Sequence, residues 1–426
     1  MDFDPSWLLL GLPIAFVLGW LASRFDLRQF RLENRQAPKA YFRGLNFLLN
    51  EQQDQAIDAF IEAVQSDPDT QELHFALGNL FRRRGDYQRA VRVHEHLLSR
   101  GDLSRADRVR AQHALAQDFL RAGLLDRAEA ALQKLEGTPF QDESRLALLA
   151  IYERSREWSH AANVAQKLDA GALASFSTRR AHHLCEQAAE RVARGETDAA
   201  SALLAEAATL APQAPRPGID MASLQMLGGH GGQGGNPAAA FDTLMRLVDS
   251  APASMPLYAP LLQQAALACD RQEAAIACLQ RSYAEAASID VLEALIGLGA
   301  QPITDDAAAT TSGDSAIIPS TDAPTLSSIG AGARPTAAGT QPDARQGYIA
   351  HLARHSSLIA ASRWLAGERF EEEAAHPLVQ RALDQAARPL LRYRCAACGF
   401  EANQHFWHCP GCQAWDSYPA RRVEEL

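Results

Sequence analysis

The sequence predicts an all-α protein: a tetratricopeptide-repeat solenoid with an N-terminal transmembrane helix and a small C-terminal metal-binding knuckle. Three observations predict this fold. An uncharged apolar run occupies residues 5–23, two glycines are separated by the length of one helical repeat, and two Cys-x-x-Cys pairs lie close together near the C-terminus. A chain of 426 residues is too long for one compact core, so we expect these features to belong to separate domains.

The expected segments follow one another along the chain. They are a membrane anchor over 1–23, a basic connector over 24–39, a tetratricopeptide array over 40–300, a disordered linker over 301–342, a helical segment over 343–392 and a four-cysteine metal domain over 393–426. The linker is rich in Ala, Thr, Ser, Gly, Asp and Pro and poor in large apolar residues. Such a segment cannot bury enough surface to offset the entropy lost on ordering, which is why we expect it to be disordered.

The apolar run at the N-terminus has the length of one membrane-spanning helix. At about 1.5 Å per residue, residues 5–23 would form roughly 28 Å of helix, close to the hydrocarbon core of about 30 Å. A cleaved signal peptide would carry basic residues before the run, whereas here Asp2 and Asp4 precede it. Basic residues instead dominate 24–43, which by the positive-inside rule places the rest of the chain in the cytoplasm. We therefore expect a single-pass anchor, and the connector either lies along anionic lipid headgroups or forms a solvated helix.

The part of the chain that follows contains a helical repeat. Gly44 and Gly78 are separated by the tetratricopeptide period of about 34 residues. A glycine on one helix lets the paired helix approach closely, and Pro68 would end the first unit because proline cannot continue the backbone hydrogen-bond ladder. Weaker units follow at 119–132, 152–168, 195–212, 240–252 and 274–283. The glycine run 228–235 interrupts one of them and leaves the register of the later repeats open.

Arrays of this kind present an extended concave surface formed by the first helix of each pair. In the first two units the predicted partner-binding residues on this surface are Tyr41, Leu45, Leu48, Leu49, Asn79, Arg82 and Arg83. Apolar residues followed by Asn and Arg would suit a peptide with a hydrophobic anchor and an acidic group. For each residue the alternative is that it is solvated or contacts a neighbouring helix.

The chain has seven cysteines, and four of them lie within 395–412. An odd number with this clustering does not resemble the disulfide framework of a small secreted protein, so we interpret the cluster as metal ligands in a reducing compartment. The other three, Cys185, Cys269 and Cys278, are expected to be buried in helices.

The clustered cysteines form two Cys-x-x-Cys pairs, a pattern typical of rubredoxin-like and zinc-ribbon domains. The expected ligands are Cys395, Cys398, Cys409 and Cys412. Four thiolates complete a tetrahedral shell and leave no position for a substrate, which predicts a structural metal. Zinc is the expected ion, with iron as the alternative because the same four ligands suit both. His405 or His408 could replace a cysteine in the shell.

Composition and motifs argue against two other classes of protein. The net charge of −10 does not favour nucleic-acid binding, which usually requires a basic face. His94-Glu95-His96 lacks the four-residue spacing of a zinc-protease helix, and no Gly-Lys-Ser/Thr follows the glycine run 228–235. We therefore expect a binding protein rather than an enzyme, with no catalytic residues and no organic cofactor.

Taken together, these features resemble the lipopolysaccharide assembly protein B family of Gram-negative bacteria. The resemblance is most specific in residues 41–50, 76–85 and 97–100, and in the Tyr393-Arg394-Cys395 and Trp407-His408-Cys409-Pro410 stretches of the metal domain. It extends over nearly the full length of the chain, with the glycine run and the linker longer than is usual in the family.

The resemblance implies a function that the composition and spacing do not. Members restrain lipopolysaccharide synthesis by bringing the UDP-3-O-acyl-N-acetylglucosamine deacetylase to the membrane AAA+ zinc protease. The anchor would then contact the protease and a membrane sensor of lipopolysaccharide in the inner membrane, and the repeats and the metal domain would hold the deacetylase. A rubredoxin-type iron protein for electron transfer and a generic envelope-assembly scaffold are the alternatives, and homo-oligomer formation stays open.

Overall fold

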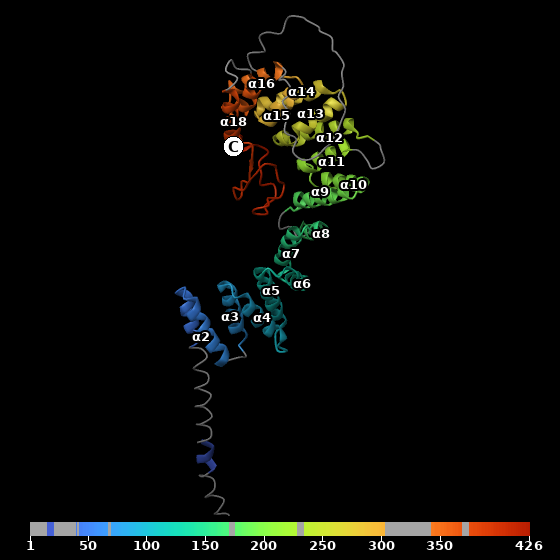
Figure 1. Ribbon diagram of the computed structural model, residues 1–426. Coiled ribbons are helices and arrows are strands. Elements are labelled where there is room, and N and C mark those ends of the chain that lie inside the picture. Colours follow the sequence, from blue (N-terminus) through green and yellow to red (C-terminus); the bar gives the residue numbers. More distant parts are fainter. Residues whose placement is uncertain are drawn as a thin grey trace, which may run out of the picture. The chain divides into compact units, whose positions relative to one another are not determined.

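The computed structural model of the protein is a chain of helical hairpins followed by a small metal-binding domain (Figure 1). The structure describes residues 15–20, 40, 42–66, 70–169, 175–227, 234–302, 342–368 and 375–426. The chain divides into two compact units, Met1–Leu173 and Ala174–Leu426. Each unit has hydrophobic clusters of its own, so we describe them separately.

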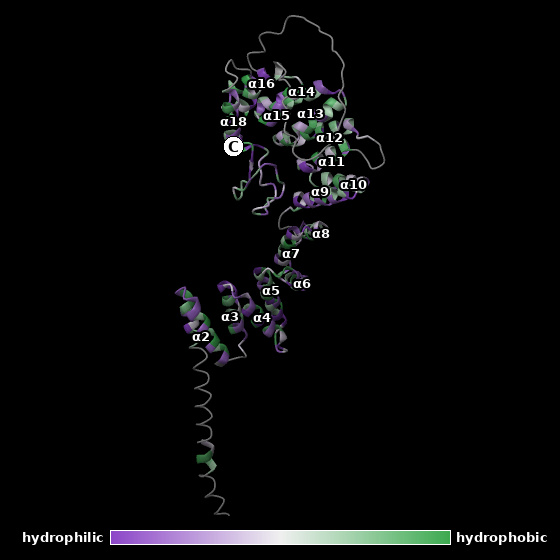
Figure 2. Cartoon of the chain, viewed as in Figure 1, coloured by the Kyte–Doolittle hydropathy of each residue, from purple (hydrophilic) through white to green (hydrophobic). Residues whose placement is uncertain are grey.

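Unit 1 consists of helices that pack in sequence as hairpins. After helical residues 42–49 come α2 (Gln53–Ser66), α3 (Gln71–Arg84), α4 (Tyr87–Ser99), α5 (Arg105–Ala122), α6 (Leu125–Gln133), α7 (Gln141–Ser155) and α8 (Trp158–Asp169). Each helix carries both hydrophobic and hydrophilic residues (Figure 2), and buried apolar residues of α2, α3 and α4 form one hydrophobic cluster. Most of the stability of such short helices comes from this packing rather than from intrinsic helix propensity.

The two glycines that define the repeat lie where paired helices approach most closely. A Cβ atom at Gly44 would lie 2.8 Å from the ring of Phe60 on α2. A Cβ atom at Gly78 on α3 would lie 2.5 Å from the ring of His94 on α4. Both separations are shorter than real Cβ contacts allow, so only glycine fits without movement. The same contact therefore recurs in both units, with a large ring on the second helix above the glycine of the first.

Several first helices end in a left-handed residue four positions after a buried aromatic ring. Gly85 has a φ of 87° and ends α3, and Gly123 has a φ of 74° and ends α5. Arg156 holds the corresponding position after Tyr152 with a φ of 61°. Glycine adopts this conformation at little cost, whereas a residue with a Cβ does not. The third turn keeps the same backbone hydrogen bonds, from the amides of Arg156 and Glu157 to the carbonyls of Glu153 and Tyr152.

Unit 2 contains further helices, most of them packed in sequence, and then the metal domain. Its elements are α9 (Ser177–Ala193), α10 (Thr197–Leu210), α11 (Pro215–Leu227), α12 (Pro237–Ser250), η1 (Pro252–Ser254), α13 (Met255–Ala268), α14 (Gln272–Glu285), α15 (Ile289–Gly297), α16 (Pro342–Leu352), α17 (Leu358–Ala366), α18 (His376–Ala387), β1 (Tyr393–Arg394), β2 (Glu401–Ala402) and η3 (Val423–Glu425). One hydrophobic cluster runs from α11 to α18. It includes Tyr258 and Leu262 of α13, both fully buried.

The prediction of a mainly helical chain is confirmed. The predicted units 119–132 and 152–168 span the hairpins α5–α6 and α7–α8, whereas 195–212, 240–252 and 274–283 each cover mainly one helix. One smaller prediction is wrong. Cys185 and Cys278 are buried in helices as expected, but Cys269 is only half-buried because it lies at the end of α13.

Two predicted segments fall largely outside the described residues. Of the anchor, residues 15–20 are described, and they form a helical turn whose side chains, such as Phe16, are exposed. Among the residues that the structure describes, no helix is long and apolar enough to span a bilayer. Nearly all of the predicted linker, 303–341, also lies outside the described part of the chain.

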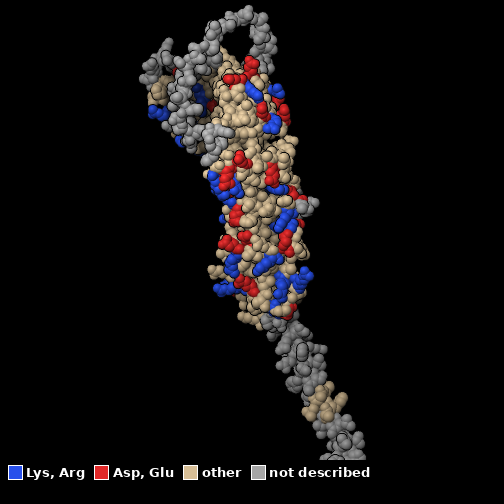
Figure 3. Space-filling model, turned by 90° about the vertical axis from the view of Figure 1, so that its right-hand side faces the viewer, with Lys and Arg blue, Asp and Glu red and all other residues tan. Residues whose placement is uncertain are grey.

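Acidic and basic side chains are interspersed on the face that Figure 3 draws, with no large region of one sign. Some charged side chains form ion pairs between helices, such as Arg110 of α5 with Glu72 of α3 and Arg127 of α6 with Glu95 of α4. Exposed pairs of this kind contribute little to stability, typically less than about 1 kcal/mol. A surface of mixed charge gives no support to nucleic-acid binding.

Candidate metal centre

The four predicted ligands lie in two turns that a short antiparallel ribbon brings together. Tyr393 of β1 pairs with Ala402 of β2, and Arg394 pairs with Glu401. Cys395 and Cys398 lie in the turn between these strands. Gly399 closes that turn with a φ of 78°, a left-handed conformation that glycine tolerates. Cys409 and Cys412 lie in the second turn, so both turns present their sulfurs to the same point.

The positions of the sulfur atoms fit one tetrahedral ion. Sγ of Cys395 is 3.8 Å from Sγ of Cys412, and Sγ of Cys398 is 3.8 Å from Sγ of Cys409. All four sulfurs lie within 4.8 Å of one another. A metal–sulfur bond of about 2.3 Å in a tetrahedron gives sulfur–sulfur edges of about 3.8 Å. The four cysteines could therefore bind one metal ion, and a shell of four thiolates leaves no open position for chemistry.

The electrostatics of the thiols show why a cation suits this site. Burial acts to raise the pKa of Cys395, but its hydrogen bond with the Ser417 hydroxyl and hydrogen bonds from the amides of Cys398 and Ala397 lower it to about 6. A backbone hydrogen bond at Phe400 acts to lower the pKa of Cys398, yet burial and the neighbouring sulfurs raise it to about 12. Cys395 thus loses its proton more readily than Cys398, whose thiol is held protonated by hydrogen bonds with the neighbouring sulfurs. A bound metal ion would favour the thiolate form of all four.

Neither histidine near the cysteines points at the sulfurs. The ring of His405 donates from Nε2 to the carbonyl of Tyr418, at 3.1 Å. The ring of His408 donates from Nε2 to the carbonyl of Gln413, at 3.0 Å. Both rings are therefore engaged in supporting the loop that carries the second cysteine pair.

The metal domain packs against helices of unit 2 through its tryptophans. Trp415 stacks on His182 of α9, with ring centroids 4.9 Å apart, and its indole also meets His183 edge-on. Nε2 of His182 lies 2.9 Å from both carboxylate oxygens of Asp416. Trp407 lies under the buried guanidinium of Arg216 of α11, 6.0 Å away. The tryptophans therefore form an interface with the helices as well as part of the small domain's own core.

The C-terminal residues connect the metal domain to α15. Arg422 makes a two-pronged ion pair with Asp290, at 2.9 and 2.7 Å, and donates a further hydrogen bond to the carbonyl of Leu391. Asp290 is buried, so its negative charge must be compensated there by Arg422. Arg422 also covers the ring of Tyr393 at 4.5 Å.

Two glutamates of η3 cap the N-termini of helices. Oε1 of Glu425 accepts a hydrogen bond from the amide of Ile289, the first residue of α15, at 2.6 Å. Oε1 of Glu424 accepts from the amides of Leu358 and Ile359 in the first turn of α17, at 2.5 and 3.2 Å. The first amides of a helix have no partner within it, and a negative charge there also favours the helix dipole. The chain terminus is thus part of the fold of unit 2.

The predicted partner-binding residues have different environments. Leu45 and Leu48 pack partly against the core cluster of unit 1, whereas Leu49 is 82% exposed. Tyr41 lies outside the described residues, and Arg83 is exposed. Partner binding by this group of residues stays a prediction.

The remaining two, Asn79 and Arg82, belong to a network inside the array. Arg82 donates to Asp118 of α5 at 2.9 Å and to the side-chain oxygen of Asn79. Asp118 is fully buried, and its second oxygen bonds Nδ1 of His94 at 2.5 Å. We expected Arg82 to offer its charge to a partner, but this charge already compensates a buried carboxylate.

Comparison with known proteins agrees with the architecture. Residues 393–418 match the family described as rubredoxin metal binding domain. Lipopolysaccharide assembly protein B of Escherichia coli K12 is 29% identical over 98% of this chain and 99% of its own length. The protein of the same name from Haemophilus influenzae is 24% identical over 96% of both chains. The predicted family resemblance is confirmed.

The resemblance to lipopolysaccharide assembly protein B thus covers the array and the metal domain together. Among solved structures, a tetratricopeptide repeat protein from Parabacteroides merdae is similar with a TM-score of 0.30 and 17% identity, over 62% of this chain and 98% of that one. Sequence reasoning found the cysteines from their spacing. It missed His182, Asp290 and Asp118, because their partners are distant in the sequence and no local pattern marks them.

Proposed function

We propose that the chain is a membrane-anchored scaffold that restrains lipopolysaccharide synthesis by presenting the UDP-3-O-acyl-N-acetylglucosamine deacetylase to the membrane AAA+ protease. The observation that carries this proposal is the nearly full-length similarity to lipopolysaccharide assembly protein B, which spans the helical array and the metal domain alike. The array supports it physically, because stacked helical hairpins provide extended surfaces for protein partners.

The closed metal site fits a scaffold better than an enzyme. Its four sulfurs would fill the coordination shell of one ion, and the domain around them is built into unit 2 by Trp415, Arg422 and the two capping glutamates. We propose zinc as the bound ion. A colourless purified protein containing one zinc per chain would support this choice, whereas a coloured, redox-active protein would indicate iron and favour the electron-transfer alternative.

The location in the inner membrane is part of the same proposal. Residues 5–23 would cross the membrane once, and the following basic residues would keep the array in the cytoplasm. Anchoring would place the scaffold in the same two-dimensional layer as a membrane protease and a membrane sensor of lipopolysaccharide. Confinement of this kind raises effective concentration without any new contact.

The deciding experiment is the half-life of the deacetylase in cells with and without this protein. The proposal expects the half-life to lengthen markedly when the protein is depleted, and to shorten again when the full chain is restored. A chain lacking residues 1–23 should fail to restore it at native expression levels, although its helices fold. An unchanged half-life on depletion would refute the adaptor function, and full restoration by the truncated chain would refute the role of the anchor.

A further inference from the structure

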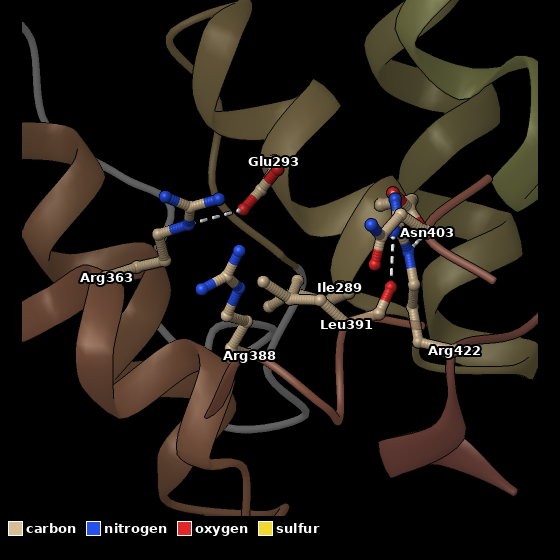
Figure 4. A pocket seen from close by; sticks show the side chains of 8 residues that line it. Ile289, Glu293, Arg363, Arg388, Leu391, Asn403 and Arg422 are labelled. Atoms are coloured by element: carbon tan, nitrogen blue, oxygen red, sulfur yellow. Dashed lines mark hydrogen bonds and ion pairs between the residues drawn. The ribbon is translucent and has the colours of Figure 1, made fainter. Parts of the chain in front are cut away.

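A cavity of about 300 Å³ lies where α15, the end of α18 and the metal domain meet within unit 2. We call it the α15 cavity; its lining residues are Ile289, Asp290, Glu293, Arg363, Arg388, Leu391, Asn403 and Arg422. Figure 4 shows that the guanidiniums of Arg363 and Arg388 point toward the same space. The helical elements and the metal domain both contribute to its walls, so it exists only in the assembled unit.

The charges of the α15 cavity are not balanced. Asp290 is paired with Arg422 at 2.7 Å, and Glu293 accepts from Nε of Arg363 at 3.2 Å. That ion pair leaves the terminal nitrogens of Arg363 able to donate further. The backbone amide of Arg388 donates to the carbonyl of Asp384, but its guanidinium has no hydrogen-bond or ion-pair partner among the residues that the structure describes. Three arginines and two acidic residues leave one net positive charge, centred on Arg388.

We propose that the α15 cavity binds a carboxylate side chain from an acidic segment of a protein partner. The carboxylate would lie between the guanidiniums of Arg388 and Arg363, each of which can donate two parallel hydrogen bonds to a planar oxyanion. Ile289 and Leu391 would contact the aliphatic part of the same segment. The inference rests on the proposed function only in taking the ligand to be a protein.

A carboxylate fits better than a phosphate group. A phosphate ester carries up to about two negative charges at neutral pH, whereas a carboxylate carries one. The cavity has one net positive charge, and its two acidic side chains would repel a second negative charge. The apolar residues beside the arginines also match the methylene groups of a Glu side chain.

The test compares two peptides on the full-length protein, purified in detergent at low ionic strength. One is an acetylated, amidated, fluorescent Gly-Leu-Glu-Leu-Gly peptide, and the other has Gln in place of Glu. Binding is followed by fluorescence anisotropy. We expect the Glu peptide to bind about three- to fivefold more tightly than the Gln peptide, because Arg388 is exposed and an exposed charge pair contributes at most about fivefold in affinity.

Two variants test whether the preference for Glu depends on the cavity or on surface charge in general: one at Arg388, directly after α18, and one at Arg381 within α18. Arg388→Gln should remove most of the preference for Glu, a loss of about three- to fivefold. Arg381→Gln is the matched control, because Arg381 is an exposed arginine of α18 that does not line the cavity. Equal binding of both peptides, or an equal loss in both variants, would overturn the proposal. So would displacement of the peptide by inorganic phosphate at lower concentration than by acetate, which would indicate a phosphate site.

The same variants give a cellular measurement that distinguishes this inference from the proposed function. If both hold and the deacetylase supplies the acidic segment, Arg388→Gln lengthens the half-life of the deacetylase and Arg381→Gln does not. If depletion of the protein leaves the half-life of the deacetylase unchanged, the proposed function fails. The binding assay still tests the preference for the Glu peptide independently.

Discussion

At the scale of single residues, the repeat depends on the absence of a Cβ atom at Gly78. Gly78→Ala would place a Cβ 2.5 Å from the ring of His94, which Asp118 holds in place. Overpacking of this kind costs about 1–3 kcal/mol, more than the gain of about 1 kcal/mol in helix propensity. We therefore expect Gly78→Ala to lower the free energy of unfolding by up to about 2 kcal/mol in urea denaturation.

Gly101→Ala provides the control for that variant. A Cβ atom at Gly101 would meet no heavy atom within 4 Å, so its effect should stay within about 0.5 kcal/mol. Equal stability of the two variants would show that the α3–α4 contact adjusts to the added methyl group.

His351 makes the stability of unit 2 depend on pH. Burial and the neighbouring His355 lower the pKa of His351 from 6.5 to about 4, and the ring is held by a 2.6 Å hydrogen bond with the hydroxyl of Tyr283. The unfolded chain therefore binds the proton more tightly than the folded chain. The stability that the neutral ring provides is complete above pH 6.5 and is lost as the pH falls toward 4.

The measurement is urea unfolding at about pH 7.5 and about pH 5, for the wild type and for His351→Gln. We expect the wild type to lose about 2 kcal/mol more than the variant over this interval, because Gln does not titrate. The other histidines are common to both proteins, so their contributions cancel. An equal pH dependence would mean that water reaches the ring of His351 in the folded protein.

At the scale of elements, the end of the chain stabilises helices that are distant in the sequence. Glu424→Ala would remove the acceptor for the first amides of α17, which we expect to cost about 1–2 kcal/mol. Glu424→Gln should unfold at a temperature between those of the wild type and Glu424→Ala, because its amide oxygen still accepts a hydrogen bond without carrying charge. Differential scanning calorimetry measures the three unfolding temperatures.

Glu190→Ala serves as the control for the cap. Glu190 is an exposed residue within α9 and has no hydrogen-bond or ion-pair partner among the described residues. Its replacement should leave the unfolding temperature nearly unchanged. If Glu424→Ala is equally harmless, water replaces the carboxylate at the start of α17.

The helices could be predicted from the sequence, but the residues at which they end were harder to predict. The glycine and aromatic periodicity predicted the first hairpins, where Gly44 and Gly78 meet a ring on the paired helix. Arg156 takes the left-handed position that glycine holds after α3 and α5, and no pattern in the sequence predicts that. Its turn is closed by backbone hydrogen bonds to Tyr152 and Glu153, which any residue other than proline can make.

At the scale of the whole molecule, the metal site should control the order of unit 2 and leave unit 1 unaffected. Cys398→Ser removes one of the four sulfurs, and we expect the metal content to fall from about one ion per chain to almost none. Because Asp416, Arg422 and the capping glutamates link the metal domain to the helices, amide protection should fall in α9, α15 and α17. Hydrogen exchange read by mass spectrometry locates the change.

The helices α2 to α8 are the internal reference for this measurement, because they belong to the other compact unit. A variant that retains its metal and its protease resistance would contradict the four-sulfur site. Loss of metal with unchanged protection in α9, α15 and α17 would show instead that the interface with the helices holds the domain without the ion.

The sequence by itself determined the class of protein. Helical periodicity, the length of an uncharged run and the spacing of cysteines are local properties, so they predict hairpins, an anchor and a metal knuckle without knowledge of the fold. The resemblance to lipopolysaccharide assembly protein B also depends on short stretches that can be read in order. The four ligands were predictable for the same reason, since both pairs lie within turns of a few residues.

Only the tertiary structure decided which residues hold the parts of unit 2 together. His182 and Asp416 are 234 positions apart, and Arg422 and Asp290 are 132 apart. Nothing local marks such pairs, because each residue alone looks like an ordinary surface charge. The α15 cavity has the same origin: Arg388 and Arg363 meet only after α17, α18 and the metal domain have packed around α15. Local patterns specify elements, whereas the pairing of distant charges depends on how those elements pack.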